Sequence, residues 1–510
     1  YGGGGKGMRI VRSADDFLPA LESCQREARN AFGRDRVLLE RYIESPRHIE
    51  IQVFADAHGD TIHLGERECS AQRRYQKVLE EAPSPFLPPE LRARMGAAAV
   101  LAARSIGYQN AGTVEFIVAP SGEFFFMEIN TRLQVEHPVT EMVTGLDLVE
   151  WQLRIAAGEP LPLAQDAVPR RGHAIEVRLY AEDPDAGFLP GSGRLQRLRL
   201  PRDAQGVRVD SGVVEGDVVT IFYDPMIAKL IVHADDREGA LARLRAALAA
   251  CIVEGPKSNI AFLERLVRHP AVVEGRIDTG YLDRHLDEFT GDGGSAEGDS
   301  ARARAAAAVA MLLGAEAEAR CAAAGSGDPG SPWAIADGWR LGHAGLRRVV
   351  LGEGEARHVA IAHGAGGDYV IEFDDGGAPL RVEGAAVASG ALQARFNDRG
   401  LRFPIDSDGA AVLVHDGTRR WRFERIAAYE PAPADAAAGG SRVAAPMPGR
   451  IVVTRVQAGD RVSEGQELLV MEAMKMELAL KAPRDGVVAG LLAREGDFVE
   501  ADAVLVTLED

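Results

Sequence analysis

Two carboxylates occupy matching positions in neighbouring apolar segments of the chain. A hairpin that turns at residues 121–122 places residues opposite each other when their numbers sum to 243, so Glu115 lies across from Glu128. Like charges in that position repel unless a cation lies between them. Asn130 lies two residues further along the same face. Two carboxylates and an amide oxygen predict a magnesium site that nucleotide phosphates would complete, with a solvated strand face as the alternative.

The segment after this hairpin contains an arginine that could bind an oxyanion and a glutamate that could act as a general base. Arg132 offers a planar guanidinium to a small oxyanion, and Glu136 could act as a general base. Pro138 disfavours helical geometry at the residue before it, so we expect a loop or an extended strand exit beside the metal. Each residue alone is a surface charge, but together with the paired carboxylates they predict a catalytic site.

A glycine run near the start of the sequence adds a phosphate-binding element. Gly2, Gly3, Gly4 and Gly5 expose bare backbone amides that could fold over a polyphosphate. The run lacks the second glycine and Lys-Ser/Thr of the Walker pattern, and a linker is the alternative for such a run alone. The acidic hairpin downstream favours the phosphate-binding interpretation.

An internal repeat surrounds Lys475 near the end of the chain. Ala445-Pro446 and Ala482-Pro483, and likewise Gly459-Asp460 and Gly496-Asp497, are offset by 37 residues. A period found by self-comparison is stronger evidence than a single motif. The two strand-rich halves predict a small flattened barrel with Lys475 at an exposed hairpin tip, and an ordinary surface lysine is the alternative.

Composition excludes several classes of protein. The chain has 510 residues and a net charge of -18, which argues against a nucleic-acid partner and predicts three or four domains. No apolar run approaches 18 residues, so we expect no membrane span. The four cysteines lie without metal-ligand or disulfide spacing, which is typical of a reducing compartment.

Two polar stretches divide the chain. Residues 291–300 are rich in glycine and acid, and residues 429–442 form a proline and alanine tether. Residues 301–324 read as one alanine-rich helix. Residues 333–428 alternate between short strands and Asp-Gly turns, which predicts an antiparallel meander or barrel without a catalytic cluster.

At this point the chain resembles two known families. The first 285 residues are similar to ATP-grasp biotin carboxylases through the motifs SPRHIEIQV (45–53), QRRYQK (72–77), MEINTR (127–132) and EHPVTE (136–141). The repeat and EAMKM (472–476) resemble a biotinyl carrier domain. The resemblance implies biotin in amide linkage to the Lys475 amine, attached by a biotin protein ligase.

The biotin carboxylase resemblance also implies roles for single residues. The glycine run, Gly2 to Gly5, would close over the phosphates of ATP, and Glu40 to Ile43 would line the adenine. His48 and Gln72 are expected near the ribose or phosphates, and Lys77 near the γ-phosphate and bicarbonate. The remaining roles are magnesium or manganese binding by Glu115, Glu128 and Asn130, bicarbonate binding by Arg132, Gln134 and Val135, deprotonation of bicarbonate by Glu136, and stabilisation by Arg178 of negative charge on biotin. Tyr75 departs from the histidine that bacterial enzymes often carry there.

The order of domains is similar to the α subunit of acyl-CoA carboxylases. That resemblance implies a carboxyltransferase β subunit as partner in a hetero-oligomer, and 3-methylcrotonyl-CoA as the acyl-CoA, in leucine degradation. Geranyl-CoA and propionyl-CoA carboxylases are the alternatives within the class, and a non-catalytic biotin-carrying assembly subunit is the alternative outside it. We expect a bacterial cytoplasmic or a mitochondrial matrix location, with any targeting segment not visible in the sequence.

The expected fold is a multidomain α+β chain. The family has one more domain before the glycine run, so we expect the sequence to be truncated at its N-terminus. The predicted units are the ATP-grasp part (1–165), the C-terminal part of the carboxylase (166–285), a linker (286–300), a helix with an antiparallel β-barrel for subunit docking (301–428), the flexible linker (429–442), and the flattened β-barrel biotinyl domain (443–510).

Overall fold

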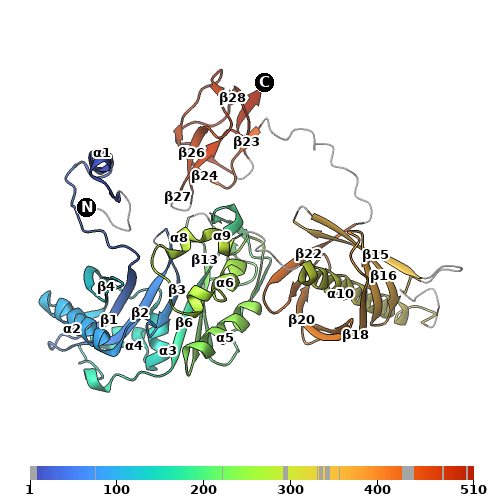
Figure 1. Ribbon diagram of the computed structural model, residues 1–510, viewed down its shortest axis with the longest axis horizontal. Coiled ribbons are helices and arrows are strands. Elements are labelled where there is room, and N and C mark those ends of the chain that lie inside the picture. The colour runs from blue at the N-terminus through green and yellow to red at the C-terminus, as the bar shows by residue number, and fades with distance from the viewer. Residues whose placement is uncertain are drawn as a thin grey trace.

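The computed structural model places an eight-stranded sheet, a closed barrel and a small C-terminal domain in one chain (Figure 1). It describes residues 8–74, 76–220, 222–290, 297–329, 331, 337–338, 345–354, 356–427, 442–473, 476–500 and 503–509. The glycine run 2–5, Tyr75, nearly all of the tether 429–442, and Lys475 lie outside these residues, and so do most of residues 332–344.

One antiparallel sheet spans both predicted parts of the carboxylase. Its spatial order is β11-β13-β6-β3-β2-β1-β4-β5. The strands are β1 (Arg47–Ala55), β2 (Thr61–Arg73), β3 (Gln76–Ala82), β4 (Asn110–Val118), β5 (Phe124–Asn130), β6 (His173–Tyr180), β11 (Val207–Ser211) and β13 (Met226–Ala234). The sheet crosses residue 165 because β6 pairs with β3, so residues far apart in the sequence meet on one surface.

Alternation along β1 shows how the sheet separates its core from its site. Ile49, Ile51 and Val53 pack with α2 (Pro89–Ser105) in one apolar cluster. The polar residues between them, including Glu50, are also buried and point to the opposite face. A strand that is polar on a buried face must find partners for every charge there.

The other helices and short strands complete the carboxylase part. The helices are α1 (Ala14–Phe32), α3 (His137–Thr144), α4 (Leu148–Ala156), α5 (Arg237–Ala249), α6 (Ile260–Leu266), α7 (Pro270–Val273), α8 (Tyr281–Arg284) and α9 (Leu286–Phe289). The short strands are β7 (Glu182–Asp183), β8 (Leu189–Pro190), β9 (Gly193–Arg194), β10 (Arg197–Arg199), β12 (Val218–Val219) and β14 (Ile252–Glu254). No helix in the described ranges is long and apolar enough to cross a membrane.

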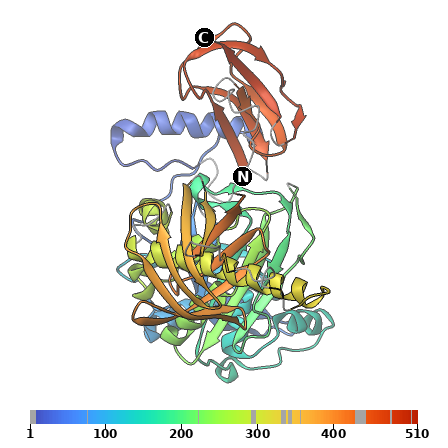
Figure 2. The same ribbon diagram turned by 90° about the vertical axis from the view of Figure 1, so that its right-hand side faces the viewer.

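The barrel forms around a helix, as the sequence predicts for residues 301–428. α10 (Glu297–Ala324) starts four residues earlier than expected and lies against the barrel strands (Figure 2). Its alanines from Ala305 to Ala308 are fully buried in the barrel core. Small side chains allow strands to surround a helix closely. The strands are β15 (Leu346–Glu353), β16 (Ala356–Ala365), β17 (Asp368–Phe373), β18 (Leu380–Ala388), β19 (Ala391–Phe396), β20 (Arg399–Ser407), β21 (Ala411–His415) and β22 (Arg420–Ile426).

A buried charge cluster joins the barrel to the carboxylase part. Glu264 on α6 lies 3.1 Å from the His415 ring and 3.3 Å from the Arg420 guanidinium, which belong to β21 and β22. Arg420 also donates to the carbonyl groups of Leu248 and Cys251. Glu264 and His415 are almost completely buried, so this interface excludes water.

The C-terminal domain reproduces the predicted repeat in its strands. Its two four-stranded sheets have the orders β23-β30-β28-β25 and β27-β26-β24-β29. The strands are β23 (Arg442–Ala444), β24 (Gly449–Thr454), β25 (Arg461–Val462), β26 (Glu467–Ala473), β27 (Met476–Lys481), β28 (Gly486–Leu491), β29 (Phe498–Val499) and β30 (Val504–Glu509). The first residues of β24 and β28, and of β26 and β30, differ by the predicted 37. The predicted multidomain α+β fold with two kinds of β-barrel is confirmed.

Candidate active site

The predicted carboxylate hairpin forms with the predicted pairing at its centre. Glu115 on β4 lies opposite Glu128 on β5, and Thr113 lies opposite Asn130. The rule that opposed numbers sum to 243 is wrong beyond Glu115, because a bulge shifts the register and pairs Phe116 with Phe126. The bulge leaves the pairing of Glu115 with Glu128 unchanged and shifts the pairing only of the residues nearer the turn.

A row of charged side chains crosses four strands at this point. Glu50 on β1 pairs with Arg67 on β2 and with Glu115 on β4, which itself pairs with Glu128. Arg67 and Glu50 are fully buried, Glu115 is nearly so, and Glu128 is exposed at the edge strand. The row therefore runs from the core of the sheet to an open edge, where a cation and its ligands can enter.

Lys77 on β3 is the hub of the cluster. Its Nζ donates to Glu50 Oε2 at 2.6 Å, to Glu115 Oε1 at 3.1 Å and to Glu136 Oε1 at 2.5 Å. Burial opposes the charge, but the surrounding carboxylates raise the pKa of Lys77 well above its ordinary value. Lys77 therefore remains a cation with all three ammonium protons in hydrogen bonds.

The acidic partners of Lys77 stay ionised for the same reason. Burial would raise the pKa of Glu50, yet Arg67 and Lys77 lower it to about 2. Burial also opposes ionisation of Glu115, and contacts with His48 and Lys77 outweigh it and lower the pKa of that carboxyl. Both groups are carboxylates at neutral pH, which is the form that binds a divalent cation.

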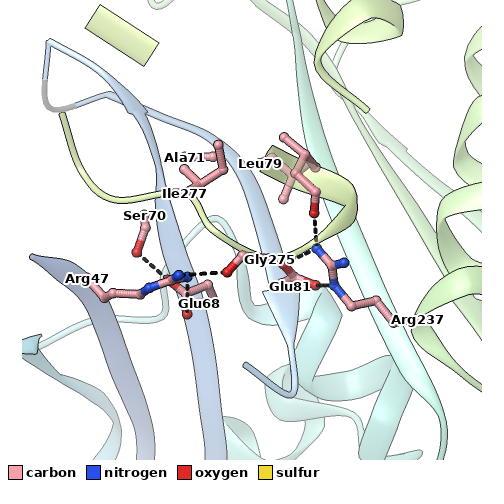
Figure 3. A pocket seen from close by; sticks show the side chains of 10 residues that line it. Arg47, Glu68, Ser70, Ala71, Leu79, Glu81, Arg237, Gly275 and Ile277 are labelled. Atoms are coloured by element: carbon pink, nitrogen blue, oxygen red, sulfur yellow. Dashed lines mark hydrogen bonds and ion pairs between the residues drawn. The ribbon is translucent and has the colours of Figure 1, made fainter. Parts of the chain in front are cut away.

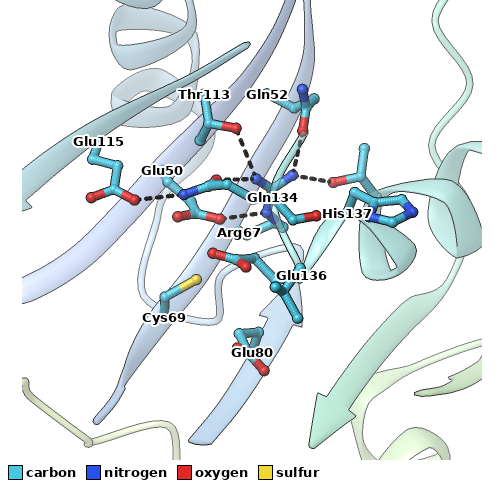
Figure 4. Close-up of polar contacts among 12 residues, drawn as sticks. Glu50, Gln52, Arg67, Cys69, Glu80, Thr113, Glu115, Gln134, Glu136 and His137 are labelled. Atoms are coloured by element: carbon cyan, nitrogen blue, oxygen red, sulfur yellow. Dashed lines mark hydrogen bonds and ion pairs between the residues drawn. The ribbon is translucent and has the colours of Figure 1, made fainter. Parts of the chain in front are cut away.

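Glu136 lies between two cations. Its Oε1 accepts from Lys77, and its Oε2 accepts from the Arg178 guanidinium on β6 at 3.0 Å. The residue comes directly before α3, and Figure 4 shows it among the charged groups of the strands. The expected loop is present over residues 131–136, but extended geometry directly before Pro138 is wrong, because His137 and Pro138 are the first two residues of α3. Proline suits the first turn of a helix, where its missing N–H is not needed.

Two neighbours hold the loop that leads to Glu136. Gln134 accepts from Arg67 at 2.9 Å and donates to Glu115 at 2.7 Å. Lys229 on β13 donates to the carbonyl of Val135 at 2.7 Å. The three consecutive residues from Gln134 to Glu136 are thus each fixed to the sheet by a charged or amide partner.

The remaining predicted site residues lie at different distances from this cluster. His48 accepts from Gln72 at 3.0 Å, and its other ring nitrogen lies 3.3 Å from Glu115, so both belong to the cluster. Arg132 is exposed and donates to the neighbouring carbonyl of Leu133 at 3.3 Å. Glu40 is exposed in the segment before β1.

Several charged residues of the site were not predicted. Glu50, Arg67, Glu80, Glu176 and Lys229 were each missed, because a single charge on a strand looks like surface. The alternation of polar residues with three β-branched apolar residues in β1 indicates a strand with one apolar core face, and it does not reveal that the polar face is also buried. The pairing of β3 with β6 has no local signal at all.

A second charged cluster lies on the other face of β2 and β3 (Figure 3). Arg47 lies 3.7 Å from Glu68 and donates to the carbonyl of Gly275, and Arg237 forms a two-point contact with Glu81 at 2.7 and 3.0 Å. They line a cavity of about 20 Å³, which is enough for a water molecule but far too small for a nucleotide. This cluster therefore holds the segment around α7 to the sheet.

Family models match four successive parts of the chain. They describe the ATP-binding domain of the carbamoyl-phosphate synthase L chain (residues 1–164), a biotin carboxylase C-terminal domain (176–284), the BT domain of the methylcrotonyl-CoA carboxylase α subunit (300–428) and a biotin-requiring enzyme domain (441–508). Together with the sheet and its charged row, these matches define a biotin carboxylase of the ATP-grasp type.

Curated relatives show to which group of biotin carboxylases the chain belongs. The chain is 41% identical to the mitochondrial methylcrotonoyl-CoA carboxylase subunit α of Dictyostelium discoideum over 99% of its length and 73% of the relative's, and 42% identical to that of Mus musculus over 100% and 71%. It is 41% identical to the propionyl-CoA carboxylase α chain of Ruegeria pomeroyi over 100% of the chain and 76% of the relative. The chain belongs to the family of acyl-CoA carboxylase α subunits.

Solved structures agree for the carboxylase part. The biotin carboxylase domain of the Hydrogenobacter thermophilus 2-oxoglutarate carboxylase, in complex with MgADP and bicarbonate, is 47% identical with a TM-score of 0.54, and the match covers 57% of this chain and 64% of that chain. A biotin carboxylase from Campylobacter jejuni is 43% identical with a TM-score of 0.54, over 56% and 63%. The predictions of an ATP-grasp carboxylase and of its enzyme class are confirmed.

Proposed function

We propose that this chain uses ATP and bicarbonate to carboxylate biotin held on Lys475, and that a separate carboxyltransferase β subunit then transfers the carboxyl group to an acyl-CoA. The position of Glu136 between Lys77 and Arg178 is the observation that carries the proposal. Two cations flank one carboxylate there, so an anion can be bound and can lose a proton at the same place.

Bicarbonate is a weak nucleophile, and the residues around Glu136 compensate for that. Lys77 and Arg178 neutralise the anion, Gln134 and the Val135 peptide orient it with Arg132 from the loop, and Glu136 accepts its proton. General-base and charge-stabilising groups contribute on the order of 10²–10⁴ each. His48, beside Glu115, and its neighbour Gln72 would face the nucleotide. The segment around Glu40 and the run Gly2–Gly5 would cover it and exclude water.

The acidic row fits a hard divalent cation. Glu115 is ionised and faces Glu128 across the hairpin, with Asn130 on the same strand as Glu128. Oxygen donors in this number suit magnesium, or manganese in its place. The bound ion would neutralise the phosphates of ATP, while the protein side chains hold the alignment of phosphate and bicarbonate.

For the acyl-CoA we propose 3-methylcrotonyl-CoA. The match of residues 300–428 to the BT domain of a methylcrotonyl-CoA carboxylase supports this choice, as do the relatives from six eukaryotes. Propionyl-CoA is the second candidate, because the Ruegeria pomeroyi α chain is equally similar. The barrel would dock the β subunit, and we propose the cytoplasm of a bacterium or the mitochondrial matrix as the location.

The proposal is tested with the full-length α subunit and free biotin. We expect bicarbonate-dependent ADP release that falls about 10²–10⁴-fold in Glu136→Gln. A biotin-sized mass increment should be present on the wild type and absent from Lys475→Arg, which should keep free-biotin carboxylation. An inactive wild type that still carries biotin would favour the non-catalytic assembly subunit, and the acyl-CoA accepted by the copurified β subunit identifies the substrate.

A further inference from the structure

Two buried glutamates face each other behind Arg178. Glu80 on β3 is paired directly with Glu176 on β6, and both are fully buried. Side chains in such a pair have Cβ atoms about 4.5–5.5 Å apart, so their carboxyl groups are within reach of each other. Arg178 contacts Glu80 Oε1 through Nε at 2.7 Å and Nη2 at 2.6 Å, and its Nη2 also donates to Glu136.

Three of the four carboxyl oxygens of this pair lack a hydrogen-bond donor among the described residues. Glu80 Oε2 and both carboxyl oxygens of Glu176 are buried, and none of the three has a hydrogen-bond partner among the described residues. A carboxylate can only accept, so two carboxylates here would leave three lone acceptors and two like charges in a fully buried site. A single proton on the pair turns one acid into a donor and satisfies two of the three oxygens.

We propose that Glu80 and Glu176 share one proton and together position Arg178. Glu176 carries the proton and donates to the free Oε2 of Glu80. Glu80 then remains ionised, and its Oε1 accepts from Arg178. Arg178 is then held in the orientation that meets Glu136. The inference about Arg178 in catalysis rests on the proposed function, whereas the shared proton does not.

The surroundings favour the protonated pair. Burial is the largest cause that raises the pKa of Glu176 well above its ordinary value, and the charges of Glu80 and Glu136 add to it. The positive charges of Lys229 and Arg178 lower that pKa but do not outweigh the increase. Burial and Glu136 likewise raise the pKa of Glu80, against Arg178 and Lys77.

α3 packs over this part of the sheet through Val139, which clusters with Ala174 and Ile231. Its titratable groups near the sheet are His137 and Glu141, and Glu141 is already paired with Arg208 at 2.6 Å. Lys229, from the neighbouring β13, is engaged by the Val135 carbonyl and by Asp210. Neither element therefore provides a free cation that could replace the proton.

Loss of the proton has a consequence for the site. With both glutamates ionised the pair would carry two like charges side by side, and the second charge would compete with Glu136 for Arg178. We expect biotin carboxylation to decline on the alkaline side as Glu176 ionises. Glu176→Gln cannot ionise but can still donate to Glu80, so it should remove this alkaline decline.

Infrared spectroscopy of the full-length subunit tests the proton without reference to activity. At neutral pH the difference spectrum of wild type minus Glu176→Gln should contain the C=O band of a protonated carboxyl, and that band should fade from the wild type as the pH rises. Glu81→Gln is the matched control. Glu81 lies on the opposite face of β3 with a lowered pKa, because contacts with His173 and Arg237 outweigh burial, so its replacement should leave the band in place.

The pH profile of free-biotin carboxylation then tests the link to Arg178. Glu176→Leu, which has no donor, should lose more activity than Glu176→Gln, and only Glu176→Gln should lose the alkaline decline. A difference spectrum without the acid band overturns the shared proton. An acid band with an unchanged pH profile in Glu176→Gln overturns the positioning role. A wild type without carboxylation refutes the proposed function, and the infrared band still decides the pair.

Discussion

Arg67 is the residue whose replacement tests the charged row most directly. It is fully buried, and its guanidinium has five N–H donors. Each donor has a partner, and the acceptors are Glu50 at 2.5 Å, Gln52 at 2.8 Å, Thr140 at 3.0 Å, Thr113 at 3.2 Å and Gln134 at 2.9 Å. One side chain thus joins β1, β4, α3 and the loop before Glu136.

Arg67→Lys keeps the charge but offers three donors in place of five, so at least two acceptors lose their partner. An unsatisfied buried polar group costs about 1–3 kcal/mol, which gives about 4 kcal/mol for two. At about 2–4 °C per kcal/mol for a domain of this size, the unfolding midpoint of the carboxylase part should fall by about 8–16 °C. Gln134 also keeps only its contact with Glu115, so the KM for bicarbonate should rise more than the KM for ATP.

Calorimetry and bicarbonate-dependent ADP release measure the two effects. Arg92→Lys is the matched control, because Arg92 is only part-buried and donates to a single carboxylate, Glu66, at 2.6 Å and to the Leu87 carbonyl at 3.2 Å. If Arg67→Lys shifted the midpoint no more than Arg92→Lys and left the bicarbonate KM unchanged, the role given to the five-donor network would be wrong.

Three further predictions concern the metal, the barrel and acid stability. Glu128→Gln should abolish magnesium-dependent ATP cleavage without shifting the unfolding midpoint, since the side chain is exposed, and undiminished turnover at ordinary magnesium would contradict the ligand role. Glu264→Gln should leave the part-buried Arg420 without its anion at a cost of at most about 3–5 kcal/mol, so limited proteolysis should cut between carboxylase and barrel sooner than in wild type. Equal cleavage rates would refute the anchor. Glu50 has a folded pKa lowered from 4.5 to about 2, so its ionised form stabilises the fold above about pH 4.5 and this stability is lost as the pH falls towards 2. The midpoint difference between wild type and Glu50→Gln should shrink across that window, and a constant difference would exclude this linkage.

The sequence predicted features that depend on short-range patterns. The pairing of Glu115 with Glu128 followed from a two-residue period and one turn, and the repeat around Lys475 followed from self-comparison. The bulge after Glu115 was missed, because an extra residue in one strand leaves no mark in the alternation. The loop expected before Pro138 forms over residues 131–136, but the helix that begins at His137 was missed, because proline both ends strands and starts helices, and its context decides which.

The partners of the charged residues were less accessible for a topological reason. Glu80 and Glu176 are 96 residues apart and meet only because β6 enters the sheet beside β3. No sequence pattern near either residue indicates that pairing, and a glutamate on a strand is usually exposed. Prediction of such contacts requires the strand order of the whole sheet, which local periodicity does not contain.

Charge balance in the site explains why the nucleotide must arrive with its own cation. Glu50, Glu115, Glu136 and Glu80 each contact at least one of the three cations Lys77, Arg67 and Arg178. Glu176, in contrast, contacts none of these cations, so in the proposed protonated form it adds no charge to the group. These four carboxylates outnumber the three cations, so the group has no excess positive charge for the phosphates of ATP. In the proposed role, the exposed Glu128 at the sheet edge binds a divalent ion that enters with them, which places the carboxylate hairpin at the open end of a row that already carries more negative than positive charge.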